Sequence, residues 1–179
     1  MIRLVFPMTV KEVQSLFNNA KRVRDTLILR FMYLSLRVGD VLRLRYENID
    51  FEESTALCTV KGGKNIIIVI DTDTMNLLRM YCQEKGIKRG PIFTITRQRV
   101  HQIIKDLATD AGLERAKLLS SHKLRHSFAV HSLDGKHLFI KNRLNLRQVQ
   151  LQMGHSKIQT TSQYLQYTTT DRKEAFGFG

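Results

Sequence analysis

The sequence predicts an α+β fold that is mostly α-helical and carries one small antiparallel β-sheet. Apolar residues recur at helical spacing over most of the chain, one stretch near residue 60 is rich in β-branched residues, and glycines separate the helical segments. The chain has 179 residues, of which 42% are hydrophobic, which is enough to bury a core. It shows no internal repeat, low-complexity tract or linker, so we treat residues 1–179 as a single domain.

The amino-terminal part predicts two helices. Thr9 and Glu12 have the spacing of a capping box, which opens an amphipathic helix that continues to about residue 20. Residues 26–36 form a second helical segment, which is far more apolar and is expected to cross the core.

A sharp turn is expected after the second helix. Gly39 would permit it, because glycine adopts backbone angles that other residues avoid, and a short helix over residues 40–45 would follow. Arg37 therefore lies at a junction from which a side chain can reach out of the core. The structural alternative for Arg37 is a salt bridge with Asp40 at the edge of the core.

The middle of the chain predicts a β-hairpin. Two runs of β-branched and short residues, 57–61 and 65–70, flank Gly62-Gly63, and glycines can take the positive φ angles of tight turns. Lys61 and Lys64 bracket the tip, where a lysine is more often a solvated charge than a catalytic group.

Helical patterns then resume, and glycines separate the helical segments. The expected helices are residues 74–84, 97–111, 121–133 and 146–153. The basic segment 136–143 has the weakest pattern and is expected to be an exposed loop or hairpin.

The charge of the chain indicates a polyanionic partner. Lys and Arg outnumber Asp and Glu by 29 to 16, which gives a formal net charge of +13. Nucleic acid is the commonest polyanion for a basic globular domain, and a merely basic soluble protein is the alternative. Cys58 and Cys82 are too far apart to indicate a disulfide framework or a cysteine zinc site. We expect a soluble cytoplasmic protein, because no secretory signal or membrane-spanning run is present.

Two short windows gather groups that are suited to breaking a phosphodiester without a metal. One contains His122, Arg125 and His126, and the other contains His155 and Tyr164. A guanidinium binds phosphate oxygens in a planar, two-pronged way, imidazole exchanges protons near neutral pH, and a phenol supplies a nucleophile.

Each of these signals has a plainer interpretation when it is taken alone. His122 and His126 lie one helical turn apart, as a metal-binding pair would, but no Glu or Cys nearby completes a site, so we expect no metal and no cofactor. Tyr164 precedes Tyr167 by three residues, a spacing that is more usual for packing. Two arginines, a lysine, two histidines and a tyrosine can nevertheless surround one phosphate, and their joint occurrence favours catalysis.

The same motifs, in the same order, resemble those of the tyrosine recombinases, or phage-type integrases. Residues 36–44 resemble the first arginine motif of this family, and residues 61–64 its β-hairpin lysine motif. Residues 122–126 are similar to the second arginine motif, and residues 154–164 to the last motif, which contains the tyrosine.

This resemblance implies the tyrosine recombinase (DNA breaking–rejoining) catalytic domain fold. It implies a site-specific recombinase or integrase that cleaves and rejoins DNA through a covalent 3′-phosphotyrosyl intermediate, without metal or ATP. The implied catalytic residues are Arg37, Lys61, His122, Arg125, His155 and Tyr164, with Asp40, His126 and Lys64 in support. The amino-terminal DNA-clamping domain of the family is not recognisable here, so we expect a catalytic domain alone.

The resemblance also implies a role for each group. Tyr164 would attack the scissile phosphate, while Arg37 and Arg125 would hold its non-bridging oxygens and stabilise the developing charge. Lys61 would protonate the departing 5′-oxygen.

The two implied catalytic histidines would assist the attack. His122 would act as base or positioner, and His155 would hydrogen-bond the phosphate. Because a free tyrosine has a pKa near 10, we expect Tyr164 to lose its proton during the attack, with its pKa partly depressed by the surrounding cations.

Double-stranded DNA is the expected partner, and the protein would be a homodimer or homotetramer on DNA, or a monomer without it. Basic residues outside the centre are expected to contact the DNA backbone. They are Arg43, Arg45, Arg97, Arg99, Lys105 and Lys123. The alternatives are a DNA-relaxing enzyme similar to a type IB topoisomerase and a non-catalytic DNA-binding regulator with the same fold.

Overall fold

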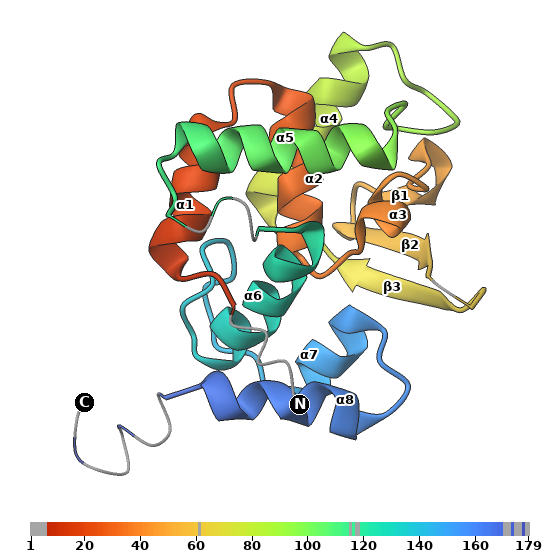
Figure 1. The fold of residues 1–179 in the computed structure, drawn as a ribbon. Helices are drawn as coiled ribbons and strands as arrows, with labels where there is room; N and C mark the ends of the chain where they lie inside the picture. Colours follow the sequence, from red (N-terminus) through yellow and green to blue (C-terminus); the bar gives the residue numbers. More distant parts are fainter. Residues whose placement is uncertain are drawn as a thin grey trace.

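The computed structural model describes residues 7–60, 62–114, 116, 119–169, 173 and 177, and in this part helices pack around α6 with a small sheet at one side (Figure 1). The α-helices are α1 (Val10–Asn19), α2 (Val23–Tyr33), α3 (Val38–Val41), α4 (Thr72–Glu84), α5 (Arg97–Asp110), α6 (Ser121–Leu133), α7 (Leu146–Met153) and α8 (Ile158–Ser162). Two 3₁₀ helices are η1 (Tyr46–Asn48) and η3 (Gln163–Tyr167), and the strands are β1 (Ile49–Asp50), β2 (Thr55–Thr59) and β3 (Asn65–Val69). The predicted α+β class with a small antiparallel sheet is confirmed.

The sheet has the order β1-β2-β3, and both strand pairs are antiparallel. The predicted hairpin is β2 and β3, which pair Leu57 with Ile67. Gly62 and Gly63 have φ angles of 90° and 76° in the connecting turn, as expected. Strand β1 was not predicted, since a strand of two residues carries too short an alternation to be recognised.

Helix α1 confirms its sequence signature. The Thr9 side chain accepts a hydrogen bond from the backbone N–H of Glu12, whose own side chain accepts from the backbone of Thr9. Val13 and Leu16 are buried on one face, so the capped helix is anchored by its apolar stripe.

The turn after α2 differs from the prediction. The helix ends at Tyr33, and the chain reverses at Ser35, which has a φ angle of 94°. Gly39 lies inside α3 and does not make the turn. A left-handed serine leaves no mark in the sequence, whereas a glycine does, so the turn was assigned to the wrong residue.

Helix α6 occupies the centre of the molecule. It packs against α2 on one side and against η3 and α7 on the other, while α4 and α5 contact α2 (Figure 1). Its buried apolar residues include Leu124, Phe128 and Leu133. A helix enclosed on several sides is buried around most of its circumference, which explains its weak amphipathicity.

Segment 136–143 is a loop, but the expectation that it would be exposed is wrong in part. His137 is buried and stacks on Tyr33, with ring centroids 4.0 Å apart, and Phe139 meets Tyr33 edge to face. The segment therefore folds back into the core through its two rings.

Among the described residues, no helix has both the length and the apolarity needed to cross a membrane. Cys58 and Cys82 are buried free thiols.

Candidate active site

Arg125 belongs to α6, and it is buried, with 4% of the residue exposed. Its Nη2 donates to the carbonyl oxygen of Met153 at 2.7 Å, and its Nη1 donates to the carbonyl oxygen of Ser35. Burial, assisted by Arg37, lowers the pKa of Arg125 to about 10, so the group stays charged at neutral pH. Arginine has five N–H donors, and those not used by the backbone remain to bind an anion.

Arg37 immediately precedes α3 and is joined to Asp40. Its Nη1 lies 3.8 Å from Oδ2 of Asp40, whose other oxygen accepts from Arg43. The expected salt bridge is present, but 35% of the Arg37 side chain stays exposed. Arg37 also lowers the pKa of Arg125 and of His155, because its charge lies close to both. The ion pair therefore places a partly accessible cation beside the buried one.

Tyr164 lies in η3 and is brought against α6. Its hydroxyl is 2.8 Å from Nδ1 of His126, and 5% of the residue is exposed. Burial raises the pKa of Tyr164, and the opposing effects of Arg125 and Arg37 do not cancel it. The expectation that the cations would depress this pKa is wrong, since loss of hydration outweighs their attraction for the phenolate.

The two histidines at the start of α6 differ in environment. Burial, together with His122 and Arg125, lowers the pKa of His126 to about 4, so its imidazole is neutral at pH 7. His122 is more exposed, and its pKa is lowered by partial burial and then by Arg37, Arg125 and other cations. Of the two, His126 is the histidine that contacts the tyrosine.

His155 follows α7 and faces Arg125. Its Nε2 lies 3.3 Å from Nη2 of Arg125, and its Nδ1 lies 3.0 Å from Oγ1 of the buried Thr161. Because arginine can only donate, Nε2 accepts, and Nδ1 carries the proton that bonds Thr161. Burial, followed by Arg125 and Arg37, lowers the pKa of His155 to about 4.

Gly154 sets the direction in which His155 leaves α7. Its φ angle is 66°, the left-handed conformation of a helix cap. A Cβ at this position would lie 3.0 Å from Cδ1 of Ile66 in β3. The glycine therefore serves both the cap and the close approach of α7 to the sheet.

The hairpin lysines can be placed only in part. Lys61 lies outside the described residues. Lys64 is exposed, and its carbonyl oxygen accepts from the backbone N–H of Val60 at 2.8 Å. This hydrogen bond closes the turn between β2 and β3 next to Lys64.

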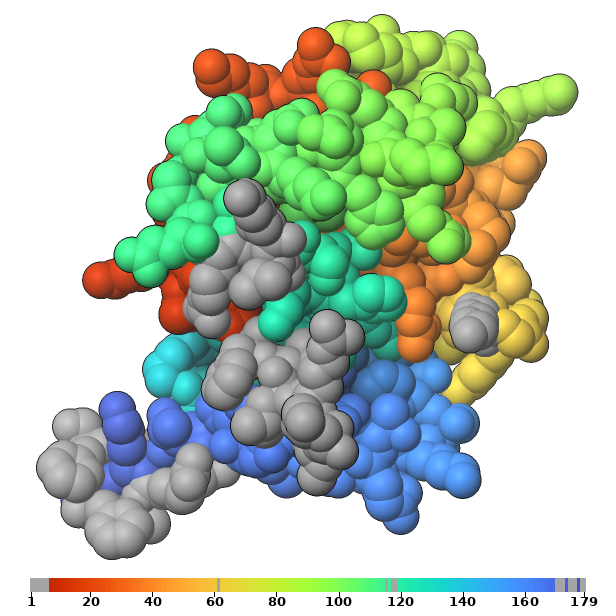
Figure 2. Space-filling model, in the orientation of Figure 1, coloured from red at the N-terminus to blue at the C-terminus, as the bar shows by residue number. Residues whose placement is uncertain are grey.

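The six basic residues expected to contact DNA fall into different environments. Arg43 pairs with Asp40 and Arg45 with Glu47. Arg97 reaches α3, where its Nη2 would lie 2.7 Å from a Cβ on Gly39. The remaining members are the exposed Arg99 and Lys105 and the half-buried Lys123. Figure 2 shows the face on which the surface of α6 lies between those of α5, α3 and the carboxy-terminal helices.

Several groups in this centre were not found from the sequence. They are the carbonyl oxygens of Ser35 and Met153 and the hydroxyl of Thr161. Backbone acceptors carry no sequence signal. Thr161 follows His155 within the same motif, which was its only available indication. Within the described ranges, no group of three or more His, Cys, Asp or Glu residues is arranged to hold a metal ion.

Comparison with known proteins gives consistent relatives. The family model described as "Phage integrase family" matches residues 7–171. The chain is similar to the tyrosine recombinase XerC of Roseiflexus sp., with 33% identity over 80% of this chain and 48% of the relative. It is also similar to XerA of Pyrococcus horikoshii, with 28% identity over 94% of this chain and 59% of the relative. The chain thus spans about half the length of these relatives.

Solved structures share the fold. A crystal structure of XerA recombinase aligns with a TM-score of 0.79 and 21% identity, covering 96% of this chain and 64% of the other. A XerH recombinase bound to its difH substrate aligns with a TM-score of 0.78 and 23% identity, covering 97% and 53%. With the family model matching nearly the whole described part, the chain belongs to the phage integrase family.

Proposed function

We propose that this chain is the catalytic part of a site-specific DNA recombinase or integrase that works through a 3′-phosphotyrosyl intermediate. The observation that carries the proposal is the gathering of a phenol, two guanidiniums and two neutral imidazoles around α6. These groups come from α3, α6, α7 and η3 and from segments next to them, so the fold assembles them from distant parts of the chain.

The two arginines supply the electrostatic stabilisation. Arg125 is held by backbone carbonyls, so its remaining N–H groups are preorganised for the non-bridging oxygens of a phosphate. Arg37 adds a second, more exposed charge, which is paired with Asp40. His155 lies beside Arg125 and donates to the same phosphate once its ring proton moves to Nε2.

Proton transfer from the nucleophile is assigned to His126. As the Tyr164 oxygen forms a bond to phosphorus, its proton passes to Nδ1 of His126, 2.8 Å away. A neutral imidazole is required for this step, and the low pKa of His126 supplies it at pH 7. His122 contributes by its position near the same phosphate.

The leaving group needs a proton donor. As the bond between phosphorus and the 5′-oxygen breaks, Lys61 gives a proton to that oxygen, with Lys64 supporting the hairpin turn. The phosphodiester energy is kept in the tyrosyl link, so attack by a 5′-hydroxyl reverses the step without ATP.

The burial of Tyr164 implies a rearrangement on DNA. Its hydroxyl is occupied by His126, and little of the ring is exposed. A scissile phosphate reaches this oxygen when η3 and the preceding α8 shift relative to α6. Both are short helices, five residues each, so such a shift breaks few backbone hydrogen bonds.

Double-stranded DNA is the proposed partner, bound as a dimer or tetramer. The net charge of +13 and the cations around α6 support this. The XerH relatives of this fold were solved on their difH substrate. A relaxing enzyme and a non-catalytic regulator remain as alternatives, and the second would have no need for the Tyr164–His126 contact.

A suicide DNA substrate, nicked close to the scissile phosphate, tests the proposal. The wild type should become covalently attached to DNA, and Tyr164→Phe should bind with similar affinity but form no adduct. Binding without an adduct by the wild type would favour the regulator. Relaxation of supercoiled plasmid without exchange between two sites would favour the topoisomerase-like alternative.

A further inference from the structure

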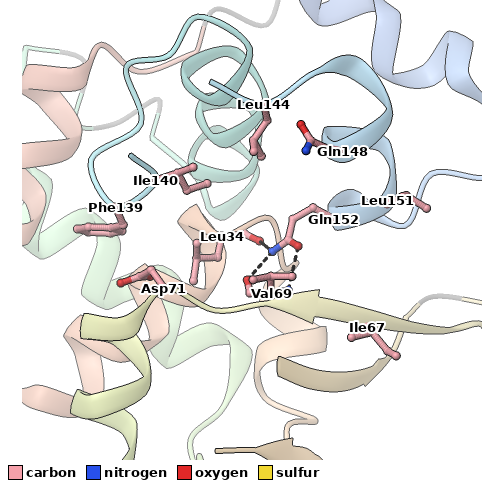
Figure 3. Close-up of a pocket in the computed structure, with 10 residues that line it drawn as sticks. All are labelled: Leu34, Ile67, Val69, Asp71, Phe139, Ile140, Leu144, Gln148, Leu151 and Gln152. Carbon is pink, nitrogen blue, oxygen red and sulfur yellow. Dashed lines mark hydrogen bonds between the residues drawn. The ribbon is translucent and has the colours of Figure 1, made fainter. Parts of the chain in front are cut away.

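The buried side-chain amide of Gln152, in α7, makes an unusual set of contacts with the backbone. Its Oε1 accepts from the N–H of Val69 at 3.0 Å, and its Nε2 donates to the carbonyl oxygens of Val69 at 2.9 Å and of Leu34 at 3.2 Å (Figure 3). Only 9% of the residue is exposed. The amide pairs with Val69 as a neighbouring strand would, at the edge of β3 that does not face β2.

The backbone of Gln152 is tied to the turn after α2. Its carbonyl oxygen accepts from Oγ of Ser35 at 2.6 Å. Ser35 is fully buried in a left-handed conformation. This contact and the hydrogen bond from the Gln152 amide to the carbonyl oxygen of Leu34 help to hold that conformation. One residue thus fixes the strand edge and the turn together.

These contacts converge on Arg125. The two carbonyl oxygens that hold its guanidinium belong to Ser35 and Met153. Met153 is the neighbour of Gln152 in the chain, and Ser35 is hydrogen-bonded to Gln152. Both acceptors therefore lie on backbone that Gln152 holds in place.

We propose that Gln152 is a positioning residue for the cleavage reaction, which orients the Arg125 guanidinium and fixes it relative to the β2–β3 hairpin. This inference rests on the proposed function. A guanidinium takes its direction from the acceptors that bind it, and a small misplacement of a catalytic group slows a reaction severely. Gln152 acts through the backbone that holds Arg125. Its loss should therefore affect the rate of strand cleavage more than the affinity for DNA.

The first test compares two identical substitutions on α7. Gln152→Leu removes all three amide contacts while keeping a similar volume. Gln148→Leu is the control, because Gln148 is exposed and its side-chain oxygen accepts from the backbone N–H of Asn145. Single-turnover cleavage of the suicide substrate should fall at least about 10-fold in Gln152→Leu, with the Kd for DNA within about threefold. Equal rates in the two variants, or a loss of affinity as large as the loss of rate, would overturn the proposal.

A second variant covers the case in which Gln152→Leu does not fold. Ser35→Ala keeps the amide of Gln152 and removes the hydroxyl that bonds its carbonyl oxygen. It should retain a cooperative thermal transition and still lower the cleavage rate several-fold. A folded Ser35→Ala protein with the wild-type rate would count against the proposal.

The ring of His155 gives a readout that does not require cleavage. Its Nε2 lies 3.3 Å from Arg125, and burial, Arg125, Arg37 and His126 together keep its pKa low. A displaced Arg125 should raise this pKa in DNA-free protein, as followed by NMR titration of the imidazole. An unchanged titration in both variants would overturn the positioning role whether or not the wild type cleaves DNA. A shifted titration in a protein that forms no adduct would instead contradict the proposed function alone.

Discussion

The hydroxyl of Tyr164 lies 2.8 Å from Nδ1 of His126, although the two residues are 38 positions apart in the chain. The pKa of His126 is held near 4, mainly by burial, while burial raises the pKa of Tyr164. The pair therefore consists of a neutral imidazole and a protonated phenol at pH 7. If the proposed function is correct, such a pair would hold the nucleophile protonated until a phosphate arrives and would then accept its proton.

Replacing His126 should impair the chemical step more than replacing His122. In His126→Ala the phenol loses its acceptor, and a general base typically contributes about 100-fold or more in rate. His122→Ala removes a more exposed group that is not the acceptor of the Tyr164 hydroxyl. Single-turnover cleavage should be measured from about pH 5.5 to about pH 7.5, one unit on either side of the free histidine pKa. It should show a large loss for His126→Ala and a smaller one for His122→Ala. The reverse order would assign proton transfer to His122.

The free energy of unfolding should fall as the pH is lowered from about 6.5 toward 4. His137 donates from Nε2 to the carbonyl of Tyr33 and accepts at Nδ1 from the N–H of Phe139, so it must be neutral in the fold. Burial lowers its pKa to about 4, whereas a free histidine titrates near 6.5. The unfolded chain therefore binds more protons in this window, and one histidine accounts for at most about 3 kcal/mol.

Urea unfolding at pH 7 and pH 5 checks this linkage. His137→Phe should be less stable than the wild type at pH 7, because two hydrogen bonds are lost, but the gap should narrow at pH 5. Parallel losses in both proteins would show that other groups control the acid response.

Gly154→Ala should destabilise the fold by about 1–3 kcal/mol, since it combines a left-handed backbone with a steric conflict. The added Cβ would lie 3.0 Å and 3.2 Å from two carbons of Ile66. Gly112→Ala is the control, with a φ angle of 64° and no atom within 4 Å of the new Cβ. Thermal unfolding should show the larger loss at Gly154, and Ile66→Val should recover part of it. Equal losses of stability at the two glycines would show that the left-handed backbone, and not the contact with Ile66, causes the destabilisation.

Arg97 is the basic residue outside the centre with the clearest structural support for DNA contact. It reaches α3 beside Gly39 and lowers the pKa of His122, so it lies close to the proposed catalytic groups. Arg97→Ala should reduce the slope of log K against log salt by about one unit, as expected for one phosphate contact. Lys85→Ala, at the end of α4 and paired with Glu84, should leave the slope unchanged. An unaltered slope in Arg97→Ala would show that Arg97 makes no contact with a DNA phosphate.

Sequence patterns located the elements better than the contacts between them. Helices α6 and α7 match their expected bounds, and each has a glycine soon after its end, at Gly135 and Gly154. The turn at Ser35 was missed, since no local signal marks a left-handed serine. The burial of Tyr164 was also missed, because the packing of η3 on α6 depends on contacts between distant segments.

In the candidate site, too, the residues could be predicted from the sequence, but not all of the contacts between them. Arg125, His155 and Tyr164 were recognised as candidates from their motifs, and the structure brings them to one place. The weight given to His122 over His126 could not be decided from spacing, because both lie at the start of the same helix. Which of them meets Tyr164 depends on where η3 crosses α6.

Mass spectrometry of the covalent adduct would identify the residue that attacks the DNA. After the wild-type chain reacts with a suicide substrate and is digested, we expect a nucleotide 3′-phosphate on the peptide that contains Tyr164, on that residue and not on the nearby Tyr167. An adduct on Tyr167, or no adduct under conditions in which the chain binds the DNA, would contradict the proposed role of Tyr164.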